Sequence, residues 1–247
     1  MPRKPKQKRQ AKIILCNFFK GGCGKTTLSV HIAGLLSENI KRQVLLMDCV
    51  GKPKSWSFFK GSSPQSNQSK SRVSETLYLL WNPPRVRMSN SAARFQPLKK
   101  SDYEPYDYVV IDSDSPPEDA ISIIGDTLPN IILVPVSLTQ AHAVEDIPEF
   151  LDLLIGEIYE QSLGLDEDEK YLPLIRIVPL GLNRDDIIEE IDIEKVDYPR
   201  IDIFRAMMPL QDETIQALKQ KKFVWNLEEA LSSYLFDYIE GLVEENL

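Results

Sequence analysis

A glycine-rich segment with two lysines and two threonines carries the clearest chemistry in this chain. Residues 20–27 read Lys-Gly-Gly-Cys-Gly-Lys-Thr-Thr, a variant of the pattern G-x-x-x-x-G-K-[ST], which cradles phosphates with backbone N–H groups. Gly21, Gly22 and Gly24 let the backbone approach phosphate oxygens and adopt positive φ angles, and Cys23 completes the loop. The segment therefore predicts binding of a nucleotide through its phosphates.

The side chains that follow the glycines fit a nucleoside triphosphate and its metal ion. Lys25 is expected to neutralise the β- and γ-phosphates, and Thr26 to place its hydroxyl on Mg²⁺. Thr27 is expected to contact the α-phosphate. A mostly apolar run at 12–19 precedes the loop, and apolar residues at helical spacing follow it. Strand, glycine turn and helix are the context that a phosphate-binding loop needs.

Two further predicted strands end in aspartates. The apolar runs at 43–48 and 106–112 finish at Asp48 and Asp112. In an open α/β sheet, ligands bind beyond the carboxyl ends of the strands, so Asp112 is expected to hold a magnesium-bound water near the loop. A nucleoside triphosphate and Mg²⁺ are therefore the predicted ligands, and the resemblance described below makes the nucleotide ATP.

Strand-like and helical segments alternate along the chain, which predicts an α/β fold with a doubly wound, mostly parallel sheet flanked by helices. A basic arm at 1–12, expected to be disordered, precedes a single predicted domain at 13–247. Residues 51–72 are expected to form a switch-type loop with a short aromatic helix, and residues 83–100 to be irregular. The remaining expected strands are 130–136, 174–179 and 201–205, and the expected helices are 74–81, 143–159, 185–195, 212–222 and 227–245.

Composition favours a reduced, cytoplasmic protein without a membrane anchor. The three cysteines, Cys16, Cys23 and Cys49, form no C-x-x-C pair and no Cys/His cluster. No run approaches the ~18 consecutive apolar residues of a membrane span, and the charged N-terminus lacks the apolar segment of a secretory signal. His31 and His142 have no triad partner by local pattern, so both are expected to be structural or surface residues.

Charge is distributed unevenly along the chain. Residues 1–100 contain 20 Lys and Arg against 3 Asp and Glu, whereas residues 101–247 contain 9 against 34. The overall net charge of −8 therefore hides a strongly basic first part. A basic part of this kind predicts a polyanion as partner.

The lysine-led loop resembles the deviant Walker A box of the ParA/MinD superfamily of ATPases, and the chain is most similar to ParA-type partition proteins. The similarity covers most of residues 12–226 and is strongest at 20–27, 43–48 and 106–117. It implies that Lys20 reaches the nucleotide of a partner subunit, so that ATP closes a sandwich homodimer. It also implies that Asp48 works beside the metal ion.

The same resemblance implies partners and further contacts. The ATP-bound dimer would bind DNA without sequence preference, and an adaptor protein of the ParB type would stimulate hydrolysis and release it. Asn183 is the implied reader of the adenine, with Pro209 in the loop over the base, although a strand-to-helix turn looks similar without a ligand. The expected DNA-binding residues are Arg3, Lys4, Lys6, Lys8, Arg9, Lys219, Lys221 and Lys222; a solubilising tail is the alternative for the arm.

Two departures from the family pattern bear on hydrolysis. The family has Asp-x-Asp after the second strand, and the second aspartate orients the attacking water; this chain has Asp48-Cys49-Val50. Valine can neither accept a proton nor hydrogen-bond a water, so hydrolysis is predicted to be slow. The segment after Asp112 is two residues longer than in the family, and we hypothesise that Asp114 partly replaces the missing carboxylate. An Asx turn or a helix cap before Pro116 is the alternative.

The favoured interpretation is a cytoplasmic, nucleoid-associated, ParA-like ATPase whose catalytic groups are Lys20, Lys25, Asp48 and Asp114. A MinD-like membrane-positioning protein would need a basic amphipathic C-terminal helix, whereas the helix expected at 227–245 is acidic. An iron–sulfur reductase component would need cysteines after the Asp112 strand, and the sequence has none beyond Cys49. An ATP-dependent ligase would need a substrate pocket, which the sequence does not identify. A nucleotide-locked tether, which binds ATP and barely hydrolyses it, is the alternative that Val50 favours.

Overall fold

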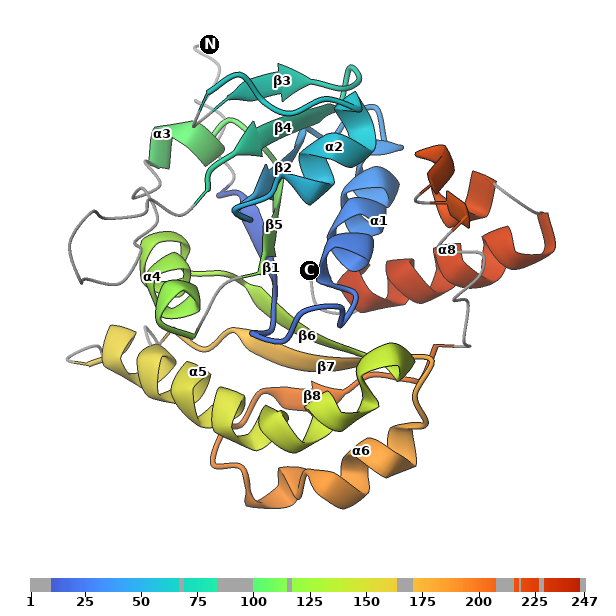
Figure 1. Cartoon of the computed structure of the whole chain (residues 1–247). Coiled ribbons are helices and arrows are strands. Elements are labelled where there is room, and N and C mark those ends of the chain that lie inside the picture. Colours follow the sequence, from blue (N-terminus) through green and yellow to red (C-terminus); the bar gives the residue numbers. More distant parts are fainter. Residues whose placement is uncertain are drawn as a thin grey trace, which may run out of the picture.

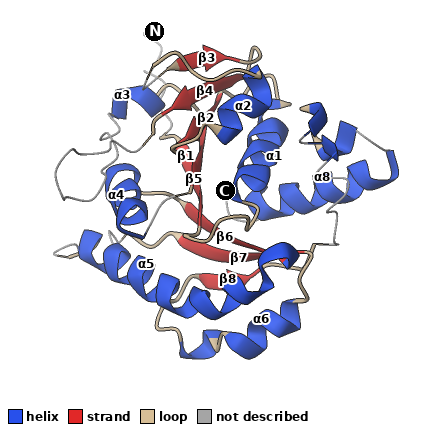
Figure 2. Cartoon of the chain, viewed as in Figure 1, coloured by secondary structure: helices blue, strands red, loops and turns tan. Residues whose placement is uncertain are grey.

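The computed structural model describes residues 10–66, 69–83, 100–114, 117–163, 171–207, 216–217, 219–226 and 229–244. Within these residues, one eight-stranded sheet has the order β3-β4-β2-β5-β1-β6-β7-β8. Neighbouring strands pair parallel, except that β3 pairs antiparallel with β4 at one edge. The predicted doubly wound, mostly parallel sheet is confirmed, and helices cover both of its faces (Figure 1, Figure 2).

The central strands are runs of buried apolar residues, as a parallel sheet covered on both faces requires. The strands are β1 (Lys12–Asn17), β2 (Val44–Asp48), β3 (Lys70–Arg72), β4 (Leu77–Trp81), β5 (Tyr108–Ser113), β6 (Ile131–Ser137), β7 (Leu174–Leu180) and β8 (Ile201–Ile203). The α-helices are α1 (Lys25–Ser37), α2 (Lys54–Lys60), α3 (Lys100–Tyr103), α4 (Pro117–Thr127), α5 (Ile147–Gln161), α6 (Arg184–Glu190) and α8 (Glu229–Glu244). The 3₁₀ helices are η1 (Leu138–Asp146), η3 (Ile193–Lys195) and η4 (Val224–Asn226).

The prediction of a helix at 74–81 was wrong, because this segment forms a turn followed by β4. The hydroxyl of Ser74 accepts hydrogen bonds from the N–H groups of Thr76 and Leu77, which makes a tight turn. The short apolar run that follows then pairs with β2 on one side and β3 on the other. A short apolar run suits either a strand or a buried helix, and here pairing across the sheet decides.

Two predicted helices have different boundaries in the structure. The segment expected to be helical from 143 begins as the 3₁₀ helix η1, and α5 starts only at Ile147, with Pro148 in its first turn. The helix expected at 185–195 ends at Glu190, because Ile191 is extended, and the chain resumes as η3. The short aromatic helix expected within 51–72 is α2.

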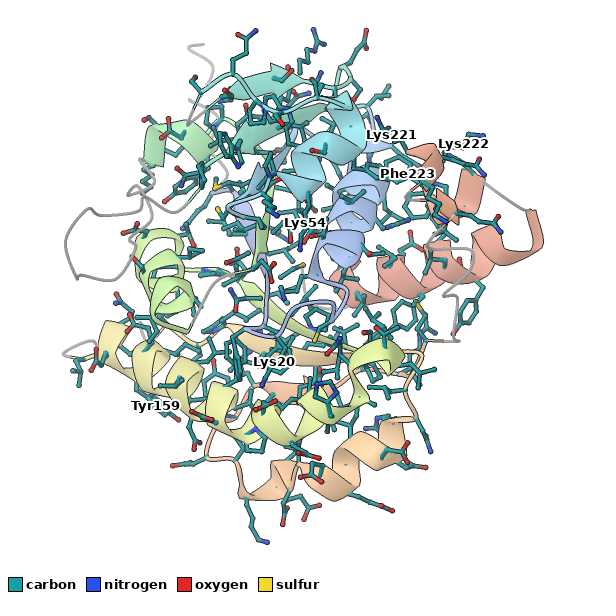
Figure 3. The ribbon with its side chains drawn as sticks, viewed as in Figure 1. Lys20, Lys54, Tyr159, Lys221, Lys222 and Phe223 are labelled. Carbon is teal, nitrogen blue, oxygen red and sulfur yellow. The ribbon has the colours of Figure 1, made fainter. Side chains whose placement is uncertain are left out.

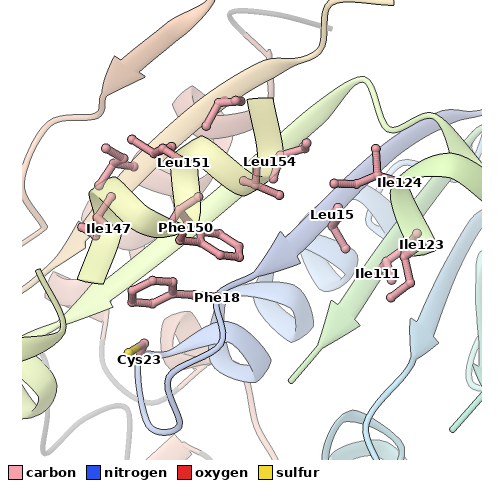
Figure 4. Packing of buried hydrophobic residues seen from close by; sticks show 14 of the residues in the cluster. Leu15, Phe18, Cys23, Ile111, Ile123, Ile124, Ile147, Phe150, Leu151 and Leu154 are labelled. Atoms are coloured by element: carbon pink, nitrogen blue, oxygen red, sulfur yellow. The ribbon is translucent and has the colours of Figure 1, made fainter. Parts of the chain in front are cut away.

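Two hydrophobic clusters fill the space between the sheet and its helices. Helices α1, α2 and α8 pack on one face, with Leu36, Phe58 and Tyr238 among their buried residues. Helices α4, α5 and α6 pack on the other face. There Phe18, which follows β1, meets Phe150 of α5 edge to face with ring centroids 5.2 Å apart (Figure 4). The first residue after β1 is thereby anchored in the core before the glycine loop begins.

His31 is a buried link between α1 and the chain before α8. Its Nδ1 lies 2.6 Å from the carbonyl oxygen of Thr27, and its Nε2 accepts the N–H of Val224 at 3.1 Å. The ring therefore donates from Nδ1 and is neutral. His31 is thus a structural residue, and His142 is exposed, as the sequence indicated for both.

The burial of His31 should make stability depend on pH below neutrality. Burial lowers the pKa of His31 to about 4, against a smaller opposing effect of its hydrogen bond to Thr27, whereas the ordinary value is 6.5. As the pH falls through this interval, the unfolded chain takes up a proton that the folded protein refuses. The folded protein therefore loses up to ~1.4 kcal/mol of stability per pH unit.

We expect the wild type to lose more stability than His31→Gln between about pH 7 and about pH 5. The acidic groups shared by both proteins cancel in this difference. Urea unfolding of the two proteins at several pH values measures it, and a stability difference that stays constant with pH would contradict the assignment.

Candidate phosphate-binding site

The glycine loop lies between β1 and α1, and its shape depends on two glycines. Gly22 and Gly24 have φ angles of +79° and +96°, which glycine adopts without strain. A Cβ atom at Gly24 would lie 2.3 Å from Leu180 Cδ1, so a larger residue would have to displace the Leu180 side chain as well as adopt the positive φ. The hydroxyl of Ser137, at the end of β6, donates to the carbonyl of Gly22 at 2.9 Å and fixes the other side of the loop.

Lys25, the first residue of α1, is the buried cation of the site, with 4% of its side chain exposed. Its Nζ donates to the carbonyl oxygen of Lys20 and lies 2.8 Å from Asp114 Oδ1. The second oxygen of the same carboxylate, Asp114 Oδ2, lies 3.1 Å from Lys54 Nζ. Partial burial acts to raise the pKa of Asp114, but the hydrogen bonds and charges of the two lysines outweigh it and hold that pKa below its ordinary value. One ionised carboxylate therefore bridges two ammonium groups.

Asp48 and Asp112 lie side by side at the carboxyl edge of the sheet, because they are paired in the register of β2 and β5. Burial, together with the charge of Asp112, raises the pKa of Asp48 to about 7, although the N–H groups of Trp56 and Val50 donate to its two oxygens. Burial also raises the pKa of Asp112, and hydrogen bonds from Ser55 and Thr26 oppose this rise. Two buried carboxylates side by side form a site that a cation would stabilise.

The described residues suit a magnesium ion that takes few ligands from the protein. Asp112 Oδ1 is buried and has no hydrogen-bond partner within this structure, and Thr26 is within reach of the same carboxylate. No group of three or more His, Cys, Asp and Glu side chains gathers into a metal cage in the described part of the chain. Mg²⁺ is usually held by one or two protein groups, with phosphate oxygens and waters completing its shell. Thr26 and Asp112 fit that requirement.

The N-terminal end of α2 contributes residues that the sequence did not single out. Three consecutive positions each bind a different acid of the site: Lys54 pairs with Asp114, the hydroxyl of Ser55 donates to Asp112, and the N–H of Trp56 donates to Asp48. The only signal in the sequence is that a short helix follows directly after the β2 strand and its aspartate. Two of its partners, Asp112 on β5 and Asp114 directly after β5, lie about 60 residues further along the chain, so sequence spacing does not reveal the contact.

Lys20 lies at the outer side of the loop. Its Nζ lies 2.9 Å from Asp146 Oδ2 and 5.1 Å from the ring centroid of Phe19, and about a third of its side chain is exposed (34%). Lys20 on the loop and Lys54 at the start of α2 lie apart from each other (Figure 3). Asp146, at the end of η1, is another contact that the sequence did not indicate.

The remaining predicted site residues fall into four groups. Cys23 is buried in the loop, and burial raises the pKa of its thiol. Asn183 precedes α6, and its side chain accepts the N–H of Asp185 at 3.3 Å as a helix cap, which is the ligand-free role considered above. Lys219, Lys221 and Lys222 are exposed. Pro209 and the arm residues Arg3, Lys4, Lys6, Lys8 and Arg9 lie outside the described residues.

Val50 carries no polar side chain into the site. The residue is 5% exposed, its N–H donates to Asp48, and its carbonyl accepts the indole N–H of Trp81 at 3.1 Å. Its backbone therefore helps to hold β4 and Asp48, while Asp114 supplies the nearest additional carboxylate to Lys25.

A glycine loop between a central parallel strand and a helix, with aspartates at the ends of the neighbouring strands, defines a P-loop NTPase fold. Residues 13–224 match the CobQ/CobB/MinD/ParA nucleotide binding domain, and the chain therefore belongs to this family of nucleotide-binding ATPases. No curated protein matches the chain.

Solved structures of three proteins share the fold. The ATP complex of a substituted McdA from Cyanothece is 16% identical, with 94% of this chain and 96% of that chain covered and a TM-score of 0.62. A ParA family ATPase from Chlorobium tepidum is 15% identical, with coverage of 94% and 99% and a TM-score of 0.64. The MinD cell division protein of Aquifex aeolicus is 16% identical, with coverage of 96% and 98% and a TM-score of 0.60. At these identities the similarity shows the fold alone.

Substitution of Gly24 should disrupt the loop where substitution of Gly21 does not. In Gly24→Ala, the positive φ and the overlap with Leu180 should reduce the free energy of unfolding by about 1–3 kcal/mol. Gly21→Ala is the matched control, because its Cβ would meet no atom within 4 Å. Urea unfolding of both variants is the measurement, and equal losses in the two would contradict the described geometry.

Proposed function

We propose that this protein is a ParA-like ATPase that dimerises on ATP, binds DNA without sequence preference, and positions DNA or another cargo with a ParB-like adaptor protein. The observation that carries the proposal is the lysine-led loop of a CobQ/CobB/MinD/ParA domain, in which Lys25 is buried and Lys20 stays accessible. One lysine is thus suited to a nucleotide in its own subunit, and the other to a nucleotide across an interface.

In the proposed site, the loop glycines and Thr27 hold the phosphates and Lys25 neutralises their charge. Thr26 and Asp112 would hold Mg²⁺, with Asp48 beside them, and the ion would offset the charge that develops on the phosphate oxygens. The reaction is phosphoryl transfer to water, which depends on positioning and electrostatics. Asn183 would face the base, where the cap that it makes for α6 fixes its orientation.

Lys20 would act in trans by exchanging partners. Its ion pair with Asp146 is partly exposed on both sides, at 34% and 28%. Exposed pairs of this kind contribute only about 0–1 kcal/mol. A triphosphate on a second subunit carries more charge than one carboxylate, so it would take Lys20 from Asp146 as the dimer closes.

The proposed DNA surface in the described residues joins two segments that are distant in sequence. Lys221 and Lys222 precede Phe223 (Figure 3). The ring of Phe223 contacts the rings of Phe58 and Phe59 of α2. The Nζ of Lys221 lies against Gly61, directly after Lys60 at the end of α2. Lysines from both segments therefore share one surface. The basic arm would add further phosphate contacts, with the salt dependence typical of them.

The described features do not favour a membrane as partner. In helix α8, Asp237 is exposed and Glu240 is partly exposed, and the last turn has no basic residue. Anionic lipid would therefore repel this helix. No helix among the described residues has the length and apolar character to cross a bilayer.

We expect ATP, but not ADP, to convert the protein to a dimer that shifts DNA in a gel. Lys20→Ala should still bind ATP in its own subunit, since Lys25 is intact, but should remain monomeric and lose the DNA shift. Light scattering and mobility shifts with ATP, with ADP and without nucleotide, at two salt concentrations, measure both properties. Lys41→Ala is the matched control, because Lys41 is an exposed lysine on the short loop between α1 and β2.

The outcomes separate the parts of the proposal. A Lys20→Ala protein that dimerises like the wild type would end the role of Lys20 in trans. A Lys221→Glu, Lys222→Glu protein should dimerise but bind DNA weakly; full DNA binding by it would assign that function to the arm.

Hydrolysis is proposed to be slow and to depend on Asp114. Single-turnover measurements with DNA and the adaptor should give a measurable rate in the wild type, and Asp114→Ala should lower it by about 10-fold or more. Unchanged turnover in Asp114→Ala would end the idea that this carboxylate replaces the one absent at Val50. A wild type without stimulated hydrolysis would instead support the nucleotide-locked tether, the second candidate, which Val50 favours.

A further inference from the structure

Lys25 and Lys54 converge on one anion from two different elements. Lys25 begins α1 and Lys54 begins α2, and each donates to a different oxygen of the Asp114 carboxylate, at 2.8 and 3.1 Å. Their ammonium groups are therefore spaced to hold two oxygens of a single group. A terminal phosphate presents three acceptor oxygens, so it can take both positions.

We propose that Lys54 is a third lysine of the phosphate site and binds the terminal phosphate of ATP within its own subunit. This inference rests on the proposed function, and it adds a residue that the deviant Walker A pattern does not contain. In a loop of this type the Lys25 position reaches the β- and γ-phosphates. A lysine that shares an anion with Lys25 from outside the loop then faces the γ-phosphate.

If a phosphate enters the site, the burial of the three side chains decides which of them gives up its partner. Lys25 is 4% exposed, Asp114 22% and Lys54 49%. Lys25 needs an anionic partner at all times, because an unpaired buried ammonium group is strongly disfavoured. Asp114 directly follows β5 and its side chain is 22% exposed, so it can yield its place to a phosphate. Lys54 then keeps an anionic partner through the exchange.

A contact between Lys54 and the terminal phosphate would make α2 a sensor of the triphosphate. Ser55 and Trp56 already tie the next two residues of α2 to Asp112 and Asp48. At its other end, the rings of Phe58 and Phe59 lie 5.9 and 6.0 Å from the ring of Phe223. Helix α2 thus joins the phosphate site to the segment that carries Lys221 and Lys222. ADP lacks the phosphate that Lys54 would bind, so it would leave this helix without that restraint.

The test compares the affinities for a non-hydrolysable ATP analogue and for ADP, measured by calorimetry. Lys54→Met should weaken binding of the ATP analogue by about 10-fold or more, the effect of one charge-assisted hydrogen bond of ~1.5 kcal/mol, and should change ADP binding by less than about threefold. Lys54→Arg should restore most of the preference for ATP. Lys52→Met is the matched control, because Lys52 is an exposed lysine two residues earlier, and it should bind both nucleotides like the wild type.

A second pair of variants separates direct contact from an indirect effect through Asp114. In an Asp114→Asn background, Lys54→Met should still reduce affinity for the ATP analogue by a similar factor. If that loss disappears, Lys54 acts only by restraining Asp114, and the proposal is overturned. Provided that the wild type binds ATP, two other results would also overturn the proposal. Lys54→Met could lose equal affinity for the ATP analogue and for ADP, or it could lose no affinity for either. A wild type that binds neither nucleotide would overturn the proposed function itself.

Discussion

The ion pair between buried Lys25 and Asp114 is the interaction on which the arrangement of the site depends. A buried ammonium group must have a partner, and the glycine loop gives Lys25 only the carbonyl of Lys20. Asp114 supplies the charge, and its second oxygen brings in Lys54. The loop, the end of β5 and the start of α2 are therefore held together by one carboxylate. A change in what occupies that position would be felt by all three elements.

Around Asp114, two lysines share one carboxylate, whereas the neighbouring carboxylates have no lysine partner of their own in the described part of the chain. Asp48 and Asp112 are buried next to each other, with backbone N–H groups and hydroxyls as their partners. Burial raises the pKa of both, so ionising the two together is unfavourable in the protein alone. This local excess of acid lies beside a local excess of lysine. A divalent cation would balance the two carboxylates, and a phosphate group would balance the lysines. This complementarity is the physical reason for proposing that a phosphate and a metal ion bind together at this edge of the sheet.

The sequence predicted the parts of this site that are encoded locally. The glycine loop needs only the order of its own residues, and the sheet needs only alternating apolar segments. The position of the loop between a strand and a helix, and the sheet itself, were therefore correctly predicted. The strand β4 was not, because its short apolar run becomes a strand only by pairing with β2 and β3. Lys54, Ser55 and Asp146 were missed for a similar reason. Their partners are brought close by sheet register or helix packing, and no motif marks them.

The three lysines near the loop differ in burial, and this difference suggests different tasks. Lys25 is enclosed and can serve only a group that enters its own loop. Lys54 is half exposed but shares its anion with Lys25, so it faces the same ligand from the other side. Lys20 is held at the outer side of the loop by a partly exposed pair with Asp146, and it alone of the three is bound to a different carboxylate. Because exchanging a partly exposed ion pair changes the free energy little, Lys20 could turn to a second subunit in the proposed dimer without disturbing the carboxylate that holds the other two lysines.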